Sequence, residues 1–142
     1  MLHKKSKIKL IGRREYVNFP LLNLFNIEAK IDTGAYTSAI HCKTIIQKVE
    51  NNKSILCIRS LDDVEHCFDT YSLKKIKNSF GEIEERYIIK TLIAIGGKKI
   101  NTTISLSDRE SMRYPVLIGR RLLKGRFVVD VNQIYTNGVT LK

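Results

Sequence analysis

The feature that most restricts the fold of this chain is a series of short segments rich in β-branched residues, separated by closely spaced turns. No helical period lasts for three turns. In the clearest unit, residues 91–95 and 100–104 flank Gly96-Gly97, a two-residue hairpin turn that needs positive φ. Many short strands with regular turns predict an all-β fold, a closed or partly closed barrel.

Strand signals cover most of the chain, and helix signals are limited to single turns. Residues 120–124 have room for one short helix that Gly125 closes, and residues 107–110 have the spacing of a capping box. The segments predicted to form strands are residues 7–11, 13–19, 27–31, 36–41, 54–60, 65–73, 71–76, 83–90, 116–118, 127–131 and a terminal hairpin at 134–141. We expect a single domain over residues 1–142 with one core.

One carboxylate stands between an apolar run and a tight turn. Residues 24–31 lead into Asp32-Thr33-Gly34-Ala35, and a small-residue strand, residues 37–40, leads away. Burial at a strand end can shift the pKa of a carboxylate, and a glycine lets the backbone turn where a Cβ would clash. Taken alone, Asp-Thr-Gly is a weak signal of function, and an ordinary turn between two strands is the default interpretation.

The familiar signatures of metal, phosphate and serine chemistry are missing from the sequence. There is no His-Glu-x-x-His, Cys-x-x-Cys, Gly-x-Ser-x-Gly or phosphate-binding glycine loop. His41-Cys42 and His66-Cys67 have the composition of a zinc site, but neighbouring side chains on a strand point to opposite faces. We therefore predict no metal site and no cofactor. Asp69-Thr70 is discounted because Tyr71 replaces the glycine.

The chain is strongly basic, with 25 Lys and Arg against 14 Asp and Glu, a net charge of +11. Such a charge favours an anionic partner, but the basic residues are scattered, so we do not expect a nucleic-acid-reading helix. No apolar run is long enough to span a bilayer, and residues 1–9 lack the apolar region of a secretory signal. Three irregularly spaced cysteines predict reduced thiols in a cytoplasmic protein.

A second element gives the Asp-Thr-Gly turn a specific interpretation. Leu117-Ile118-Gly119-Arg120, taken with Asp32-Thr33-Gly34-Ala35, resembles the two halves of the active-site signature of retropepsin-like aspartic proteases. In that fold, a loop bearing Asp-Thr-Gly passes beside a strand that ends in two apolar residues and a glycine. A short helix follows, and residues 120–124 stand in the matching place.

The resemblance extends to a bacterial family of retropepsin-like aspartic endopeptidases, which also carries the older label "ATP-dependent zinc protease". Its segments occur here in order: Gly12-Arg13-Arg14-Glu15, Lys30 to Ala35, Thr37-Ser38-Ala39, Gly81 to Arg86, Ile95-Gly96-Gly97, Asp108 to Pro115, Leu117 to Arg120 and Gly125 to Asp130. They cover about residues 10 to 130. The zinc and the ATP of the older label find no support in these residues.

The resemblance implies that Asp32 is a catalytic residue of a peptidase. Two carboxylates must share a proton across one water, and a chain with one Asp-Thr-Gly supplies only one of them. We therefore expect a two-fold homodimer in which Asp32 of each subunit meets on the axis. Around it, Thr33 would bond across the axis, Gly34 and Ala35 would line the cleft floor, and Leu117, Ile118 and Gly119 would pack behind the loop.

Substrate contacts are expected from the loop and from a hairpin that folds over the cleft. Tyr36 occupies the position that is acidic in viral retropepsins, so Arg120 needs a different partner. The flap is expected at the turn of Asn78, Ser79, Phe80 and Gly81, with Asn51-Asn52 as the competing hairpin.

We expect a peptide or protein substrate, and the basic charge favours an acidic one. The family's association with glutamate-ligating enzymes suggests a glutamate-tailed protein. Two alternatives stay open: a retropepsin-fold binding or regulatory module without proteolysis, and a basic domain associated with nucleic acid.

Overall fold

The computed structural model of the chain describes residues 7–77, 80–108 and 112–137. The strands are β1 (Lys9–Gly12), β2 (Arg14–Phe19), β3 (Leu24–Ile31), β4 (Ala39–His41), β5 (Thr44–Glu50), β6 (Lys53–Arg59), β7 (Glu65–Phe68), β8 (Ser72–Lys77), β9 (Ile83–Ile95), β10 (Lys98–Ser107), β11 (Val116–Ile118) and β12 (Phe127–Asp130). The helices are single turns, η1 (Pro20–Leu22) and α1 (Arg120–Leu123), and none of those described could cross a membrane.

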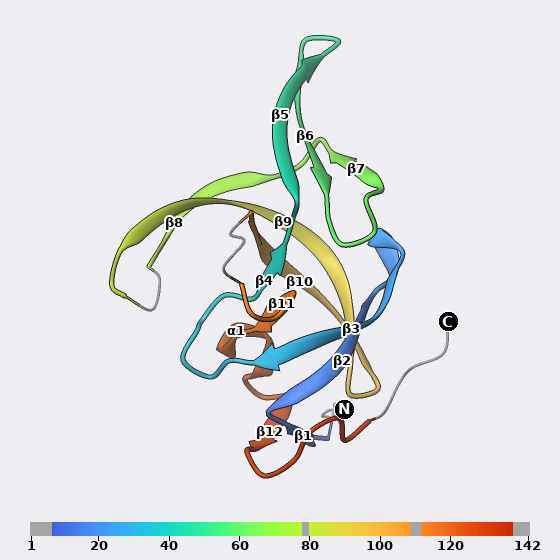
Figure 1. The fold of residues 1–142 in the computed structure, drawn as a ribbon, viewed down its shortest axis with the longest axis vertical. Helices are drawn as coiled ribbons and strands as arrows, with labels where there is room; N and C mark the ends of the chain where they lie inside the picture. The colour runs from blue at the N-terminus through green and yellow to red at the C-terminus, as the bar shows by residue number, and fades with distance from the viewer. Residues whose placement is uncertain (1–6, 78–79, 109–111, 138–142) are drawn as a thin grey trace, which may run out of the picture.

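Hydrogen-bonded strand pairs form a ring that runs β10, β4, β11, β3, β2, β9 and back to β10 (Figure 1). One pairing in this ring is short, because β2 pairs with β9 only through Asn18 and Ala94. The molecule is therefore a partly closed, nearly all-β barrel with one short α-helix, which confirms the fold predicted from the sequence.

The barrel encloses an aliphatic core built by alternation along the two longest strands. Ile89, Ile93 and Ile95 of β9 are buried, as are Ile104 and Leu106 of β10. Side chains of a strand alternate between its faces, so every second residue reaches the interior. Each buried isoleucine contributes about 1.5–3 kcal/mol to folding, and the core fixes the strands that carry the candidate site.

Two hairpins behave as the turn residues predict. Gly96 and Gly97 have φ of +58° and +77° and join β9 to β10. Asn51 and Asn52 have φ of +50° and +63° and join β5 to β6. With β7, these last two strands form a separate three-stranded sheet, and the β5–β6 hairpin projects from the barrel (Figure 1).

The hairpin of β8 and β9 is also present, with Lys77 paired to Ile83. Residues 65–73 were predicted as one strand, and that prediction is wrong: β7 ends at Phe68 and β8 begins at Ser72. The two strands belong to different sheets, because β7 pairs with β6 and β8 pairs with β9. A chain that changes sheets must break its pairing in between.

The ends of the described chain are held to the barrel by buried polar contacts. Glu15 is only 1% exposed, and its Oε2 accepts hydrogen bonds from Gly12 N at 2.7 Å and from Thr136 Oγ1 at 2.6 Å. The strands predicted for a hairpin over 134–141 are absent from residues 134–137, and the remainder lies outside the described residues. Main-chain hydrogen bonds from Arg13 N to Gln133 O and from Tyr135 N to Arg14 O also hold this segment. A helical turn was also predicted at residues 107–110. Ser107 is the last residue of β10, and residues 109–110 lie outside the described residues.

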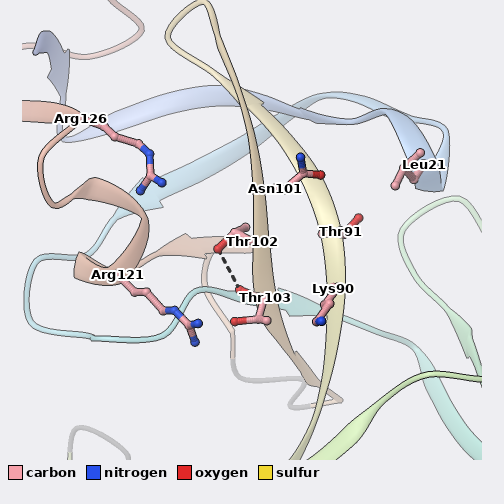
Figure 2. A pocket seen from close by; sticks show the side chains of 8 residues that line it. All are labelled: Leu21, Lys90, Thr91, Asn101, Thr102, Thr103, Arg121 and Arg126. Atoms are coloured by element: carbon pink, nitrogen blue, oxygen red, sulfur yellow. Dashed lines mark hydrogen bonds between the residues drawn. The ribbon is translucent and has the colours of Figure 1, made fainter. Parts of the chain in front are cut away.

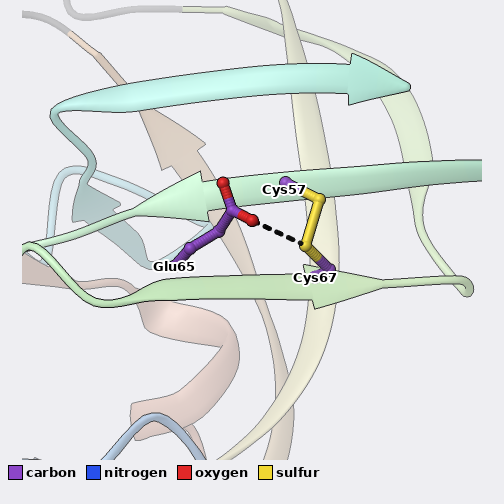
Figure 3. Close-up of side chains that lie close together, drawn as sticks. All are labelled: Cys57, Glu65 and Cys67. Atoms are coloured by element: carbon purple, nitrogen blue, oxygen red, sulfur yellow. Dashed lines mark hydrogen bonds between the residues drawn. A yellow bond between two sulfur atoms is a disulfide. The ribbon is translucent and has the colours of Figure 1, made fainter.

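The prediction that all cysteines are reduced is wrong for two of them. Cys57 of β6 and Cys67 of β7 stand directly opposite each other and form a disulfide (Figure 3). The cause is strand register, because opposed residues of antiparallel strands bring their Cβ atoms to about 4.5–5.5 Å. Cys42 remains a free, buried thiol, and burial and the nearby Asp108 carboxylate raise its pKa to about 12.

Thiol counting tests this assignment. Only Cys42 is free, and its high pKa leaves almost no reactive thiolate near neutral pH. Native protein should therefore show no titratable thiol with Ellman's reagent, and denatured but unreduced protein should show one. Protein that is first reduced and then denatured should show three thiols, one for each cysteine. Three thiols in unreduced, denatured protein would contradict the disulfide.

Candidate active site

The loop after β3 is shaped by a strand from much later in the chain. β11 lies between β3 and β4, with Ile118 beside Ile31 in parallel and Leu117 beside Ala39 in antiparallel pairing. The chain that leaves β3 at Ile31 must therefore cross the end of β11 before it returns as β4. This crossing brings residues 117–119 against the loop of residues 32–38.

Backbone hydrogen bonds hold this loop along its length. Asp32 N donates to Ile118 O at 2.8 Å, and Ala35 N donates to Asp32 O at 3.1 Å. From the start of α1, Arg120 N donates to Ala35 O at 2.8 Å and Arg121 N donates to Tyr36 O at 3.0 Å. The loop is therefore positioned by main-chain groups, independently of its own side chains.

Gly119 is required by close packing and not by an unusual backbone conformation. Its φ is −95°, which any residue adopts. A Cβ added there would lie 2.6 Å from Tyr36 O and 2.9 Å from the Thr37 carbonyl carbon. The absence of a side chain is what lets the backbone of 36–37 pass over the end of β11.

Buried serines complete the support, and sequence reasoning did not single them out. Ser38 is 3% exposed, and its hydroxyl accepts a hydrogen bond from Gly119 N at 3.0 Å. The Ser38 carbonyl accepts from Ser105 N at 2.9 Å and from Ser105 Oγ at 3.1 Å. A small polar residue that follows the turn, within Thr37-Ser38-Ala39, was the available signal.

The carboxylate of Asp32 stands half-buried at the surface of the subunit. Its Oδ1 accepts a hydrogen bond from Gly34 N at 3.2 Å, and the described residues supply no other hydrogen bond to the carboxylate. Thr33 and Gly34 beside it are exposed. The arrangement presents one oriented carboxylate, with an oxygen available, on an open face of the chain.

Arg120 has the alternative partner that the sequence could not identify. Its Nη1 donates to Thr33 O at 2.9 Å, and its guanidinium lies 5.8 Å from the centre of the Tyr36 ring. An aromatic face attracts a cation through its quadrupole, so Tyr36 can replace an acidic residue at this position. The contact fixes the carbonyl that directly follows Asp32.

The residues predicted for substrate binding are distributed over two regions. Tyr36 belongs to the loop and is 57% exposed. Phe80, 82% exposed, and Gly81, with φ of +81°, belong to the turn of the β8–β9 hairpin. Asn78 and Ser79 lie outside the described residues. The structure therefore brings Thr33 to Tyr36 together with Leu117 to Gly119, while the flap residues are on a separate hairpin.

Within the described part of the chain, one group of possible metal ligands comes close together: Cys57, Glu65 and Cys67. Figure 3 shows the bond that joins the two sulfur atoms beside the Glu65 carboxylate. Sulfur atoms bonded to each other are not thiolates, so this group does not fit zinc in the oxidised state.

Comparison with known proteins decides the family. The family model described as RimB-like, "Retropepsin-like aspartic endopeptidase RimB", matches residues 10–139. The chain belongs to this retropepsin-like family. This confirms the resemblance inferred from the ordered motifs and the type of barrel.

Relatives of this RimB-like chain carry a different name. A "Probable alpha-L-glutamate ligase" from Shewanella halifaxensis is 29% identical over 91% of the chain, and one from Desulfotalea psychrophila is 28% identical over 86%. The matches cover only 30% and 28% of those relatives. This chain therefore spans less than a third of their length.

A solved structure supports the fold of this RimB-like chain. A protein of unknown function from Legionella pneumophila superimposes with a TM-score of 0.71, at 23% identity, over 92% of this chain and 98% of that one. At this level of identity, the likeness establishes the architecture alone.

Proposed function

We propose that this protein is an aspartic endopeptidase with Asp32 as its catalytic residue. The observation that carries the proposal is the half-buried Asp32 carboxylate on a loop fastened by Ile118 O and Arg120 N. Membership of a retropepsin-like family supports the assignment. Positioned donors and a fixed carboxylate are what general acid–base chemistry at a peptide carbonyl requires.

The chemistry needs a second carboxylate, and we propose that a second copy of the chain supplies it. Thr33 and Gly34 beside Asp32 are exposed, so the loop has an open face that a two-fold partner can meet. Two carboxylates that close cannot both ionise, so the pair holds one proton and titrates as a unit.

The proposed reaction is water attack on the peptide carbonyl. The ionised carboxylate takes a proton from the water while the water oxygen bonds to the carbonyl carbon of the peptide. The protonated carboxyl donates a hydrogen bond to the developing oxyanion. Collapse of the tetrahedral intermediate breaks the C–N bond, and the leaving amine receives the proton that the carboxylate took from the water. In each subunit, Gly34 N orients one oxygen of Asp32.

We further propose an acidic, glutamate-rich peptide as the substrate class. The net charge of +11 favours an anionic partner. The relatives named as probable glutamate ligases support glutamate peptides specifically, because this domain forms part of those longer proteins. Cleavage would then act on the kind of chain that a glutamate ligase is named for building.

Subunit mixing tests the shared site. Wild-type protein is allowed to exchange subunits with an equal amount of Asp32→Asn chains, and cleavage of a glutamate-tailed peptide is followed at acidic to neutral pH. Random exchange should lower activity per wild-type chain to about half, because mixed dimers hold only one intact carboxylate. Mixing with Asp69→Asn chains is the control and should change nothing. Undiminished activity with Asp32→Asn chains would mean that each chain acts alone.

A binding or regulatory module is the second candidate. The observation that favours it is the name of the relatives, in which this domain accompanies a protein called a ligase. A module of this kind would bind glutamate peptides without cleaving them. Peptide binding by wild-type protein with no cleavage at any pH would favour this candidate over the peptidase.

A further inference from the structure

A pocket of about 570 Å³ lies apart from the Asp32 loop. Its lining comes from η1, β9, β10, α1 and the segment after α1, and none of it from residues 32–38 (Figure 2). The lining residues are Leu21, Lys90, Thr91, Asn101, Thr102, Thr103, Arg121 and Arg126. The volume is typical of small-molecule sites and larger than a simple ion needs.

All the charged side chains that line this pocket are positive. Lys90, Arg121 and Arg126 contribute three cations, and no carboxylate is among the lining residues. Within the described residues, none of the three forms a salt bridge, and Arg126 donates one hydrogen bond, from Nη1 to Leu122 O at 3.0 Å. Three cations without counter-charges leave a positive potential that an anion would neutralise.

The threonine hydroxyls of the lining are enclosed by the protein itself. Thr91 is 4% exposed, and its Oγ1 is buried, as is Oγ1 of Thr103. Figure 2 shows the threonines of β10 beside the arginines of α1 and the following segment. A ligand in the pocket would therefore be bound by the cations, and not by these two hydroxyls.

We propose that this pocket binds the phosphate group of a small molecule. Three cations exceed the single charge of a carboxylate, whereas a phosphate carries about two charges and several acceptor oxygens. A guanidinium binds two such oxygens with parallel hydrogen bonds, and Arg121 and Arg126 supply two guanidinium groups. The proposal does not depend on the peptidase activity.

Thermal unfolding with added phosphate tests the site in the whole chain. Sodium phosphate should raise Tm above sodium chloride of matched ionic strength, because a ligand that binds only the folded state stabilises it by mass action. Arg121→Gln keeps the backbone N–H on Tyr36 O and should weaken the apparent phosphate affinity about tenfold. Arg113→Gln removes the same charge from an exposed residue outside the pocket and should leave the affinity unchanged.

Lys90→Gln separates binding from folding. Lys90 is exposed and forms no salt bridge within the described residues, so Tm without phosphate should stay near that of wild type. The phosphate-dependent increase in Tm should shrink, because one cation of the pocket is lost. A lysine that takes no part in binding would leave the phosphate response unchanged.

Comparing anions identifies the ligand class. Glucose 6-phosphate should bind at least as tightly as inorganic phosphate if the remaining volume accepts the organic part, and succinate should bind more weakly than both. Succinate binding as tight as phosphate would overturn the assignment to phosphate. Equal phosphate effects on wild type, Arg121→Gln and Lys90→Gln would show general salt stabilisation and would overturn the site itself.

Discussion

Replacing Asp32 by Asn is expected to lower peptidase turnover by about a thousandfold, within the range that general acid–base catalysis contributes. Asn keeps the size of the side chain and can still accept from Gly34 N through its amide oxygen. It cannot take a proton from the attacking water. Stability should change little, because Asp32 is half-exposed and forms no salt bridge within the described residues.

The matched control for this experiment is in the same chain. Asp69 is also followed by threonine, is exposed, and lacks the glycine of the active-site turn. Asp69→Asn should keep wild-type turnover. Initial rates of peptide cleavage, with Tm measured on the same samples, distinguish loss of chemistry from loss of fold. Turnover that survives in Asp32→Asn would exclude Asp32 as the catalytic residue.

Replacing Gly119 by Ala is expected to destabilise the protein by about 3 kcal/mol and to lower Tm by about 10 °C. The added Cβ would lie 2.6 Å from Tyr36 O, so the backbone of the loop or of β11 must move. Neither can move alone, because Asp32 N and Arg120 N bond across the same junction. Activity should fall even in the folded fraction, since Asp32 shifts with its loop.

Gly125→Ala is the informative comparison for this substitution. Gly125 has φ of +77° and nothing within 4 Å of an added Cβ, so alanine there meets conformational strain without a clash. The expected cost is about 1–2 kcal/mol, and turnover of the folded protein should be unchanged. Denaturant unfolding and cleavage rates measure both effects. If Gly119→Ala were as stable and active as wild type, the close packing of β11 on the loop would be wrong.

Much of the fold was accessible from the sequence because local patterns encode it. Alternation of apolar residues marks strands, and the Gly96-Gly97 and Asn51-Asn52 turns need backbone conformations that few other residues adopt. The ordered segments also indicated the family, and the pairing of β11 with β3 places Leu117 to Gly119 beside the Asp32 loop. The catalytic role of that loop rests on the experiments above.

Contacts between distant segments depended on the tertiary structure. The opposition of Cys57 and Cys67 follows from the register of β6 and β7, which cysteine spacing does not reveal. The partners of Arg120, Thr33 O and the Tyr36 ring, result from the path of the loop over β11. The sequence thus determined most of the strands, the hairpin turns and the Asp-Thr-Gly signature through local conformational preferences, but it missed β5, Thr44–Glu50, and the start of β4 at Ala39. Strand register, the disulfide and the cationic pocket were decided only when folding brought remote residues together.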